Sequence, residues 1–287
     1  LCLPDATGFG IDWLAAAPEL QLNRWTEPET PMTQTGNFLV HPDTGRVVFF
    51  SPTHPLPANE PVRIAIIAGP PAYHEYALAY DGVWEAYEAL ARLYPKQIEL
   101  LPLLTHASPD EVNNLLDRQP HVVHMVMHAQ MLDISGQNRG QIAFARDAEN
   151  GAQQDWTELD FDPDPEWFDG NALAALFSRY QPALVILQSG EVSQLTWQRG
   201  LRDVAAILAK SKTLAVLNWQ FPVEESSVAK FIHTFFLAFA QGMPSDEAVQ
   251  NGRRALLRDD NPLAFAAPSL FSNTIVCRRT ANEPVPR

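Results

Sequence analysis

The chain has 287 residues, of which 46% are hydrophobic and 19% are charged, a composition that excludes a disordered protein and suffices for one large globular domain. A formal net charge of −14, without any lysine or arginine cluster, argues against a surface that binds nucleic acid or phosphate. Two cysteines are too few for a disulfide framework. Because no apolar stretch reaches the roughly 18 residues of a membrane span, and residues 1–5 lack a signal-peptide pattern, we expect a cytoplasmic protein with no membrane partner.

The first 61 residues are predicted to form a proline- and tryptophan-rich extension that precedes a main domain over residues 62–287. Two apolar runs, Phe38–Val40 and Arg46–Phe50, flank a turn sequence that contains Gly45, a pattern typical of a β-hairpin. We expect this small β-rich extension to pack on the main domain through the aromatic residues Trp13, Trp25 and Phe49. It carries no chemical motif.

From Val62 onward the sequence alternates between short apolar runs and amphipathic segments. Buried strands are expected over residues 62–68, 97–101, 121–129, 182–190, 213–218 and 270–277, with one more candidate at 141–145 inside a long polar connection. Helices are expected over 82–94, 171–180, 201–210 and 228–239, together with one that follows the capping box Ser108–Glu111 and one capped by Ser245. This alternation predicts an α/β fold with a mostly parallel sheet between helices.

Two of the expected strands end in polar or small residues. The run 121–129 ends near His128, and the run 182–190 ends in Gln188-Ser189-Gly190, followed by Glu191. Open α/β sheets keep their ligands at the carboxyl ends of the strands. His124 and His128 lie four residues apart, so on one strand they share a face. A histidine within a strand is more often a satisfied core residue, whereas His128 stands where the strand stops.

Other common sites are not indicated by the sequence. Gly69-Pro70-Pro71 lacks the glycine and lysine spacing of a phosphate-binding loop. The eight histidines show no zinc-binding spacing, and the acidic run 160–166 lacks the glycine and terminal glutamate of a calcium loop. We therefore expect no metal and no cofactor, and we interpret the acidic run as a solvated loop.

Four segments, in order, resemble those of CHAT domains, which are caspase-like cysteine peptidases of clan CD. Residues 123–129 are similar to the H-x-x-x-H-G segment of that family, and residues 182–191 resemble its L-V-V-L-x-A-C-E-S segment. Residues 214–225 resemble V-V-A-x-x-W-P-V-x-D-E, and residues 231–256 resemble the F-Y-x-x-L-x-x-G-x-P ending with its arginine pair. The resemblance covers about residues 62–277 and implies a caspase-like, mostly parallel sheet sandwiched by helices.

The resemblance also implies a Cys–His dyad, in which His128 is the base and a cysteine thiolate attacks a peptide carbonyl. The position of that cysteine falls on Gly190, which has no nucleophilic atom, and Ala129 stands where the family has glycine. Ser189 could replace the thiolate only if the turn shifted by one residue, and Ser193 only if it shifted by three. The implied substrate-binding residues are His124, Ala129, Gln188, Glu191, Trp219 and Glu224.

These observations favour a pseudopeptidase that binds a protein or peptide partner in a prokaryotic defence or cell-death type system, with any sensor or active peptidase on another chain. A second hypothesis is an active Cys–His endopeptidase whose cysteine was replaced by glycine. A third is an α/β module that binds a small molecule. A tightly bound peptide, detected by mass spectrometry, would favour the first two hypotheses over the third.

Overall fold

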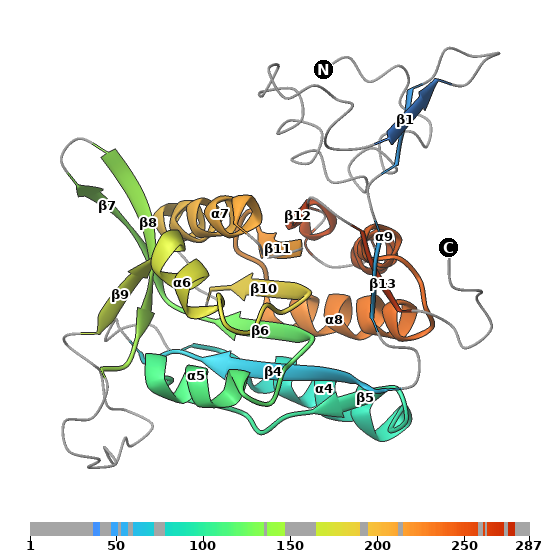
Figure 1. Cartoon of the computed structure of the whole chain (residues 1–287), viewed down its shortest axis with the longest axis horizontal. Coiled ribbons are helices and arrows are strands. Elements are labelled where there is room, and N and C mark those ends of the chain that lie inside the picture. The colour runs from blue at the N-terminus through green and yellow to red at the C-terminus, as the bar shows by residue number, and fades with distance from the viewer. Residues whose placement is uncertain are drawn as a thin grey trace.

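The computed structural model describes residues 37–40, 47–50, 53–56, 60–71, 78–134, 137–146, 165–189, 195–211, 215–257, 261, 263–272 and 275–278. A six-stranded sheet runs through the middle of the main domain (Figure 1). In spatial order its strands are β12 (Pro268–Ser272), β11 (Ala215–Trp219), β10 (Leu184–Gln188), β6 (Val122–Val126), β4 (Val62–Ala68) and β5 (Ile98–Leu100). Every pair is parallel except β11 with β12. The prediction of a mostly parallel sheet is therefore confirmed.

Helices cover both faces of this sheet, as expected. They are α4 (Asp81–Leu93), α5 (Pro109–Leu116), α6 (Gly170–Leu176), α7 (Leu195–Lys210), α8 (Glu225–Ala240) and α9 (Ser245–Leu256), followed by the short 3-10 helix η2 (Ala264–Ala266). Helices α4, α8 and α9 share one hydrophobic cluster with the sheet, and α5, α6 and α7 share the other. Strands β6, β10 and β11 lie deep in the sheet and are buried on both faces, which explains their continuous apolar runs.

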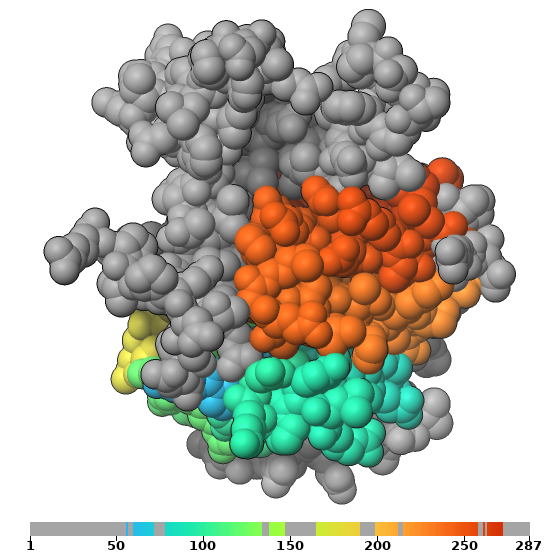
Figure 2. All heavy atoms as spheres, turned by 90° about the vertical axis from the view of Figure 1, so that its right-hand side faces the viewer, coloured from blue at the N-terminus to red at the C-terminus, as the bar shows by residue number. Residues whose placement is uncertain are grey.

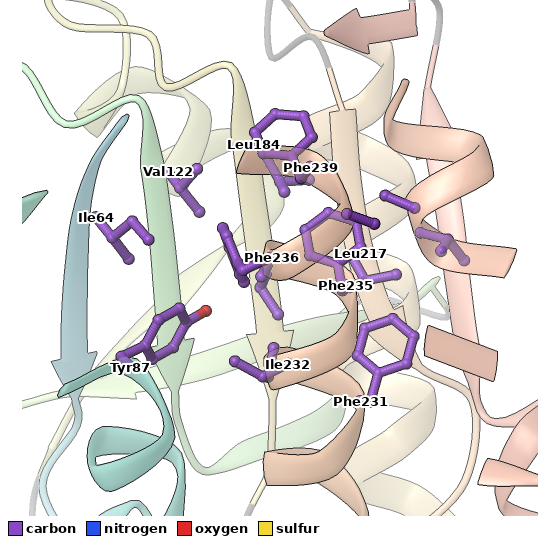
Figure 3. Packing of buried hydrophobic residues seen from close by; sticks show 14 of the residues in the cluster. Ile64, Tyr87, Val122, Leu184, Leu217, Phe231, Ile232, Phe235, Phe236 and Phe239 are labelled. Carbon is purple, nitrogen blue, oxygen red and sulfur yellow. The ribbon is translucent and has the colours of Figure 1, made fainter. Parts of the chain in front are cut away.

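The first cluster is dominated by the aromatic side chains of α8. Phe231, Phe235 and Phe239 recur at helical spacing, and Phe235 stacks on both of the others at centroid distances of 5.8 and 5.6 Å. These side chains face Leu184 and Leu217 of the sheet (Figure 3). Figure 2 shows the outer side of this layer, where the orange surface that includes α8 and α9 adjoins the teal surface that includes α4. The apolar helix over 228–239 is thus a core element, as predicted.

The capping chemistry differs between two of the helices. At the start of α5, the Ser108 hydroxyl accepts from the Glu111 N–H and the Glu111 carboxylate accepts from the Ser108 N–H, so the predicted capping box is confirmed. The expectation that Ser245 caps α9 is wrong. Ser245 is the first helical residue, the N-cap position is Pro244, and no side chain bonds there.

The connection between His128 and Gly170 is richer in strands than expected. It contains a second, antiparallel sheet of β7 (Ala129–Ile134), β8 (Gln137–Phe144) and β9 (Glu166–Asp169), where only a strand over 141–145 was predicted. The strand predicted over 121–129 is consequently two strands in two sheets. The run 270–277 is likewise divided between β12 and β13 (Ile275–Arg278). Hydrophobic periodicity predicts each of these apolar runs as one strand, because it does not reveal where the chain passes from one sheet to another.

The predicted N-terminal hairpin is confirmed, since β1 (Asn37–Val40) pairs antiparallel with β2 (Val47–Phe50). A further strand, β3 (Thr53–Leu56), pairs in parallel with β13. The contacts expected of Trp13, Trp25 and Phe49 lie outside the described side chains. Among the described residues, no helix has the length and hydropathy that would let it cross a membrane.

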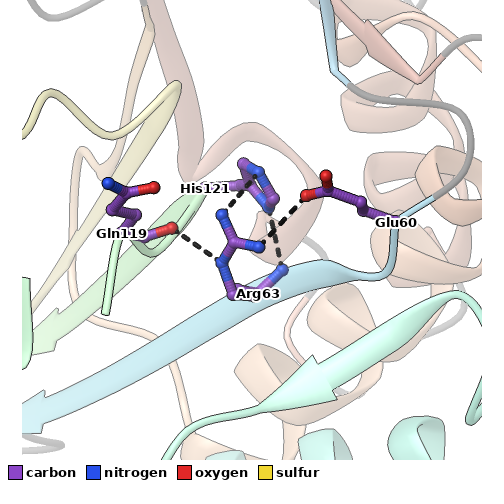
Figure 4. A network of polar contacts seen from close by, with 4 residues as sticks. All are labelled: Glu60, Arg63, Gln119 and His121. Carbon is purple, nitrogen blue, oxygen red and sulfur yellow. Dashed lines mark hydrogen bonds and ion pairs between the residues drawn. The ribbon is translucent and has the colours of Figure 1, made fainter. Parts of the chain in front are cut away.

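A network of hydrogen bonds and an ion pair connects the amino end of β4 to the residues that precede β6 (Figure 4). The backbone N–H of Arg63 donates to Nδ1 of His121 at 3.0 Å, and its Nε donates to the Gln119 carbonyl at 2.9 Å. Its guanidinium also pairs with Glu60 at 3.2 Å. Burial, together with the Arg63 charge, lowers the pKa of His121 from 6.5 to about 4. The neighbouring strands are thus tied together at the end opposite the predicted site.

Candidate functional site

The two strands that carry the predicted dyad positions are neighbours. β6 and β10 pair in parallel, with Val126 opposite Gln188. One residue further, the Met127 N–H donates to the Gln188 carbonyl at 2.8 Å. His128 lies two residues beyond β6, and Ser189 lies one residue beyond β10. Both residues are therefore at the carboxyl edge, where an α/β sheet holds its site.

His128 lies at the junction between the two sheets. Its carbonyl accepts from the Ala143 N–H of β8 at 2.9 Å, and Ala129 then begins β7. The His128 side chain is fully buried, with 0% exposure, and Ala129 is equally buried. A base acting on a substrate must be reachable by it, so a ligand approaches His128 only after the residues that cover it move.

A hydrogen-bonded chain of side chains runs beneath these strand ends. The Tyr87 hydroxyl of α4 lies 3.0 Å from Nδ1 of His124, and Nε2 of His124 lies 2.9 Å from Oε1 of Gln188. Burial lowers the pKa of His124 from 6.5 to about 4, against the opposing effect of the Gln188 hydrogen bond. Burial also raises the pKa of Tyr87 well above 10.0. All three groups are therefore neutral at pH 7.

The other predicted site residues are distributed along the same edge. Ser189 is 6% exposed, and Trp219, at the end of β11, is 1% exposed. Glu224 is exposed at the N-cap of α8, where its side chain makes no capping bond. Gly190 and Glu191, like Ser193, lie outside the described residues. The structure thus joins His124 to Gln188 directly and brings His128 and Ser189 to adjacent strand ends.

Two residues at this edge were missed in the sequence. Glu225, in the first turn of α8, accepts the Gly82 N–H of α4 through Oε1 at 2.6 Å, so it caps a helix that has no side-chain cap of its own. Tyr87 lies on the buried face of α4 together with Leu90, and nothing in that spacing indicates a polar partner. The pairing of Glu225 with Gly82 spans 143 residues, so no local pattern reveals it.

No group of three or more histidine, cysteine or acidic side chains suited to a metal ion occurs among the residues that the structure describes. The buried part of the site contains the hydrogen-bonded side chains of Tyr87, His124 and Gln188 below the ends of parallel strands. Such an arrangement can orient a peptide, and it acquires acyl-transfer chemistry only when a nucleophile stands beside His128.

The fold is caspase-like: a mostly parallel sheet lies between helices, with His128 and Ser189 beyond the ends of adjacent strands. A family profile described as the CHAT domain matches residues 59–275. The chain therefore belongs to the CHAT domain family.

Two solved structures are similar to the chain. One is separase in the separase–securin complex of Saccharomyces cerevisiae, with 10% identity and a TM-score of 0.42, over 75% of this chain and 12% of that one. The present chain thus corresponds to a small part of the separase chain. The other is the Drosophila initiator caspase Dronc, with 8% identity and a TM-score of 0.44, over 86% of this chain and 93% of that one. No curated protein sequence matches the chain.

Proposed function

We propose that this CHAT domain is a pseudopeptidase that works by binding a peptide segment of a partner protein. The observation that carries the proposal is the glycine at position 190, which the motif matches with the family's cysteine. A cysteine peptidase forms its acyl-enzyme through a thiolate. Glycine provides no atom for that bond, so the chain as it stands has no such step.

The arrangement of the two strands that lead to His128 and to position 190 supports the proposal. β6 and β10 are adjacent, with His128 two residues beyond β6 and Ser189 one residue beyond β10. A Cys–His dyad requires neighbouring strand ends of this kind. The cysteine on a described strand, Cys277, does not replace the missing thiolate. Cys277 lies on β13, which pairs with β3 on the side of the molecule opposite the carboxyl ends of β6 and β10 (Figure 1), and Cys2 is at the start of the chain, outside the described residues.

Peptide binding suits the groups at this edge better than small-molecule binding does. Gln188 and Trp219 end neighbouring parallel strands, and Glu224 is exposed on the connection that follows β11. Backbone and amide groups along strand ends offer a peptide several hydrogen bonds in sequence. The sequence shows no phosphate or cofactor loop. The partner belongs, in this proposal, to a prokaryotic defence or cell-death type system whose sensor is another chain.

The proposal is tested by comparing the unaltered chain with Gly190→Cys on a mixed peptide library. We expect the unaltered chain to cleave none of the peptides and Gly190→Cys to cleave some of them, because only the nucleophile is missing. The matched control is Gly190→Cys combined with His128→Ala, which should abolish that cleavage. Binding of the library peptides to the unaltered chain is measured in parallel by mass spectrometry.

Cleavage by the unaltered chain would refute the loss of catalysis and direct attention to Ser189. If Gly190→Cys cleaves no peptide and the unaltered chain retains none, the proposal that the chain binds a peptide is refuted. If the unaltered chain retains a peptide but Gly190→Cys cleaves none, peptide binding is supported. The catalytic geometry then differs at more than the one residue.

A further inference from the structure

The hydrogen-bonded chain Tyr87–His124–Gln188 crosses an otherwise apolar layer. Tyr87 and His124 are each 0% exposed and Gln188 is 4% exposed. Their surroundings are the hydrophobic side chains of α4, α8 and the sheet, and the Tyr87 ring also packs edge-on against Phe236 at 5.1 Å. In Figure 3 the Tyr87 ring extends from its helix between the sheet and α8. Buried polar groups cost stability unless they are satisfied, so a connected chain in this place fixes a unique arrangement.

The chemistry of the three groups sets the direction of every hydrogen bond. Oε1 of Gln188 is an amide oxygen and only accepts, so Nε2 of His124 donates to it. The ring is neutral, so Nδ1 carries no proton and accepts from the Tyr87 hydroxyl. Because Oε1 faces His124, the NH₂ group of the Gln188 amide points away from His124 and is left to donate to another acceptor. The chain therefore presents an N–H donor at the tip of β10.

A second N–H donor lies on the same face of the sheet. Leu187 is opposite Asn218 in the register of β10 and β11, so Gln188 and Trp219 occupy the next row. Trp219 belongs to the same hydrophobic cluster as Tyr87. It is 1% exposed, yet its indole Nε1 has no hydrogen-bond partner within the part of the chain that the structure describes. A buried donor without an acceptor costs free energy, and a bound ligand's oxygen would recover it once the residues that cover the indole move, as at His128.

We propose that Tyr87 and His124 are positioning residues that hold the Gln188 amide with its NH₂ group outward, and that this group and the Trp219 indole N–H bind a carbonyl oxygen of the peptide segment. This inference rests on the proposed function and assigns two of its contacts. Tyr87 and His124 never touch the peptide.

The donors fit a neutral carbonyl better than a carboxylate. Neither Gln188 nor Trp219 carries a charge, and both are almost completely buried. Burying an anion without a compensating positive charge costs free energy. The carboxylates of Glu224 and Glu225 follow β11 within six residues of Trp219, and their negative charge disfavours a second anion nearby. A backbone or side-chain amide carbonyl of an extended peptide meets both conditions.

The first test needs no ligand. Nitrogen-15 NMR of the imidazole of His124 in the full chain should show a protonated Nε2 and an unprotonated Nδ1, unchanged between pH 8 and pH 5.5. Tyr87→Phe should shift the Nδ1 resonance, because that nitrogen loses its donor. A Nδ1–H tautomer would overturn the inference, since Gln188 would then turn its oxygen outward.

The second test measures binding of acetylated, amidated 12-residue peptides that the unaltered chain retains from an array. We expect Gln188→Met to weaken binding about tenfold and Tyr87→Phe about threefold, the range for one lost hydrogen bond. Tyr94→Phe, which removes a hydroxyl after the same helix but outside the chain of three, is the matched control and should leave binding unchanged. Trp219→Phe should also weaken binding while keeping an aromatic ring.

An ester scan of the peptide separates contact from general destabilisation. Each backbone amide is replaced in turn by an ester, whose carbonyl is the weaker acceptor. One position should weaken binding to the unaltered chain by about threefold or more and have no further effect in Gln188→Met, which is the signature of a direct pair. Equal peptide affinity of Gln188→Met and the unaltered chain would overturn this inference and leave the proposed function standing. Absence of any peptide binding would overturn both.

Discussion

Lowering the pH from 8 to 5 should destabilise the fold through His124. The ring has 0% exposure and accepts its Tyr87 hydrogen bond only while Nδ1 is unprotonated. Burial lowers its pKa from 6.5 to about 4. Between these two values the unfolded chain binds a proton that the folded chain does not, so stability that is complete above pH 6.5 is lost as the pH falls towards 4.

The size of this effect follows from the two pKa values. At pH 5 the unfolded imidazole is almost fully protonated and the folded one almost fully neutral. The free energy of unfolding should therefore be about 2 kcal/mol lower at pH 5 than at pH 8 because of His124 alone. His121 contributes in the same direction, but its ring is only partly buried, so solvent screening makes its share smaller.

The assay is urea unfolding at pH 8, 7, 6 and 5 for the unaltered chain and for His124→Gln, which has no titrating ring. His121 and the carboxylates are common to both proteins, so the difference between the two pH dependences isolates His124. Equal pH dependence in both proteins would refute the reasoning. So would an NMR titration of His124 near pH 6.5 in the unaltered chain, a measurement that holds even where His124→Gln does not fold.

Three substitutions test the packing around the site, each by urea unfolding. Phe235→Ala removes a fully buried ring and should cost about 3–5 kcal/mol; a loss below 1 kcal/mol, on the order of a surface change, would contradict the stacked core. Gly200→Ala should destabilise, although alanine normally favours a helix, because its Cβ would lie 2.5 Å from the Gln130 carbonyl oxygen; a gain in stability would show that α7 has room to move. Glu225→Gln should cost about 1 kcal/mol by weakening the cap on Gly82, and an unchanged midpoint would show that solvent satisfies that N–H equally well.

Local patterns in the sequence were enough for the elements of the central sheet and the helices around it. The runs at 62–68 and 182–190 predicted buried strands because burial on both faces demands continuous apolar residues. The apolar repeat of 228–239 predicted α8 because one face of a helix recurs every three to four residues. The capping box at Ser108 was readable because its hydrogen bonds join residues three positions apart. For the site, the ends of two strands marked His128 and Ser189 as neighbours.

The tertiary structure alone decided the rest. The division of 121–129 between two sheets depends on β8, which pairs with β7 and whose Ala143 N–H binds the carbonyl of His128. His124, predicted as a substrate-binding residue, hydrogen-bonds in the folded chain to Tyr87, 37 residues away, and to Gln188, 64 residues away. The spacing of residues within one segment does not indicate such partners, because they come into contact only when separate elements pack. Burial and hydrogen bonding, which set the charge and direction of each buried group, are therefore properties of the assembled fold.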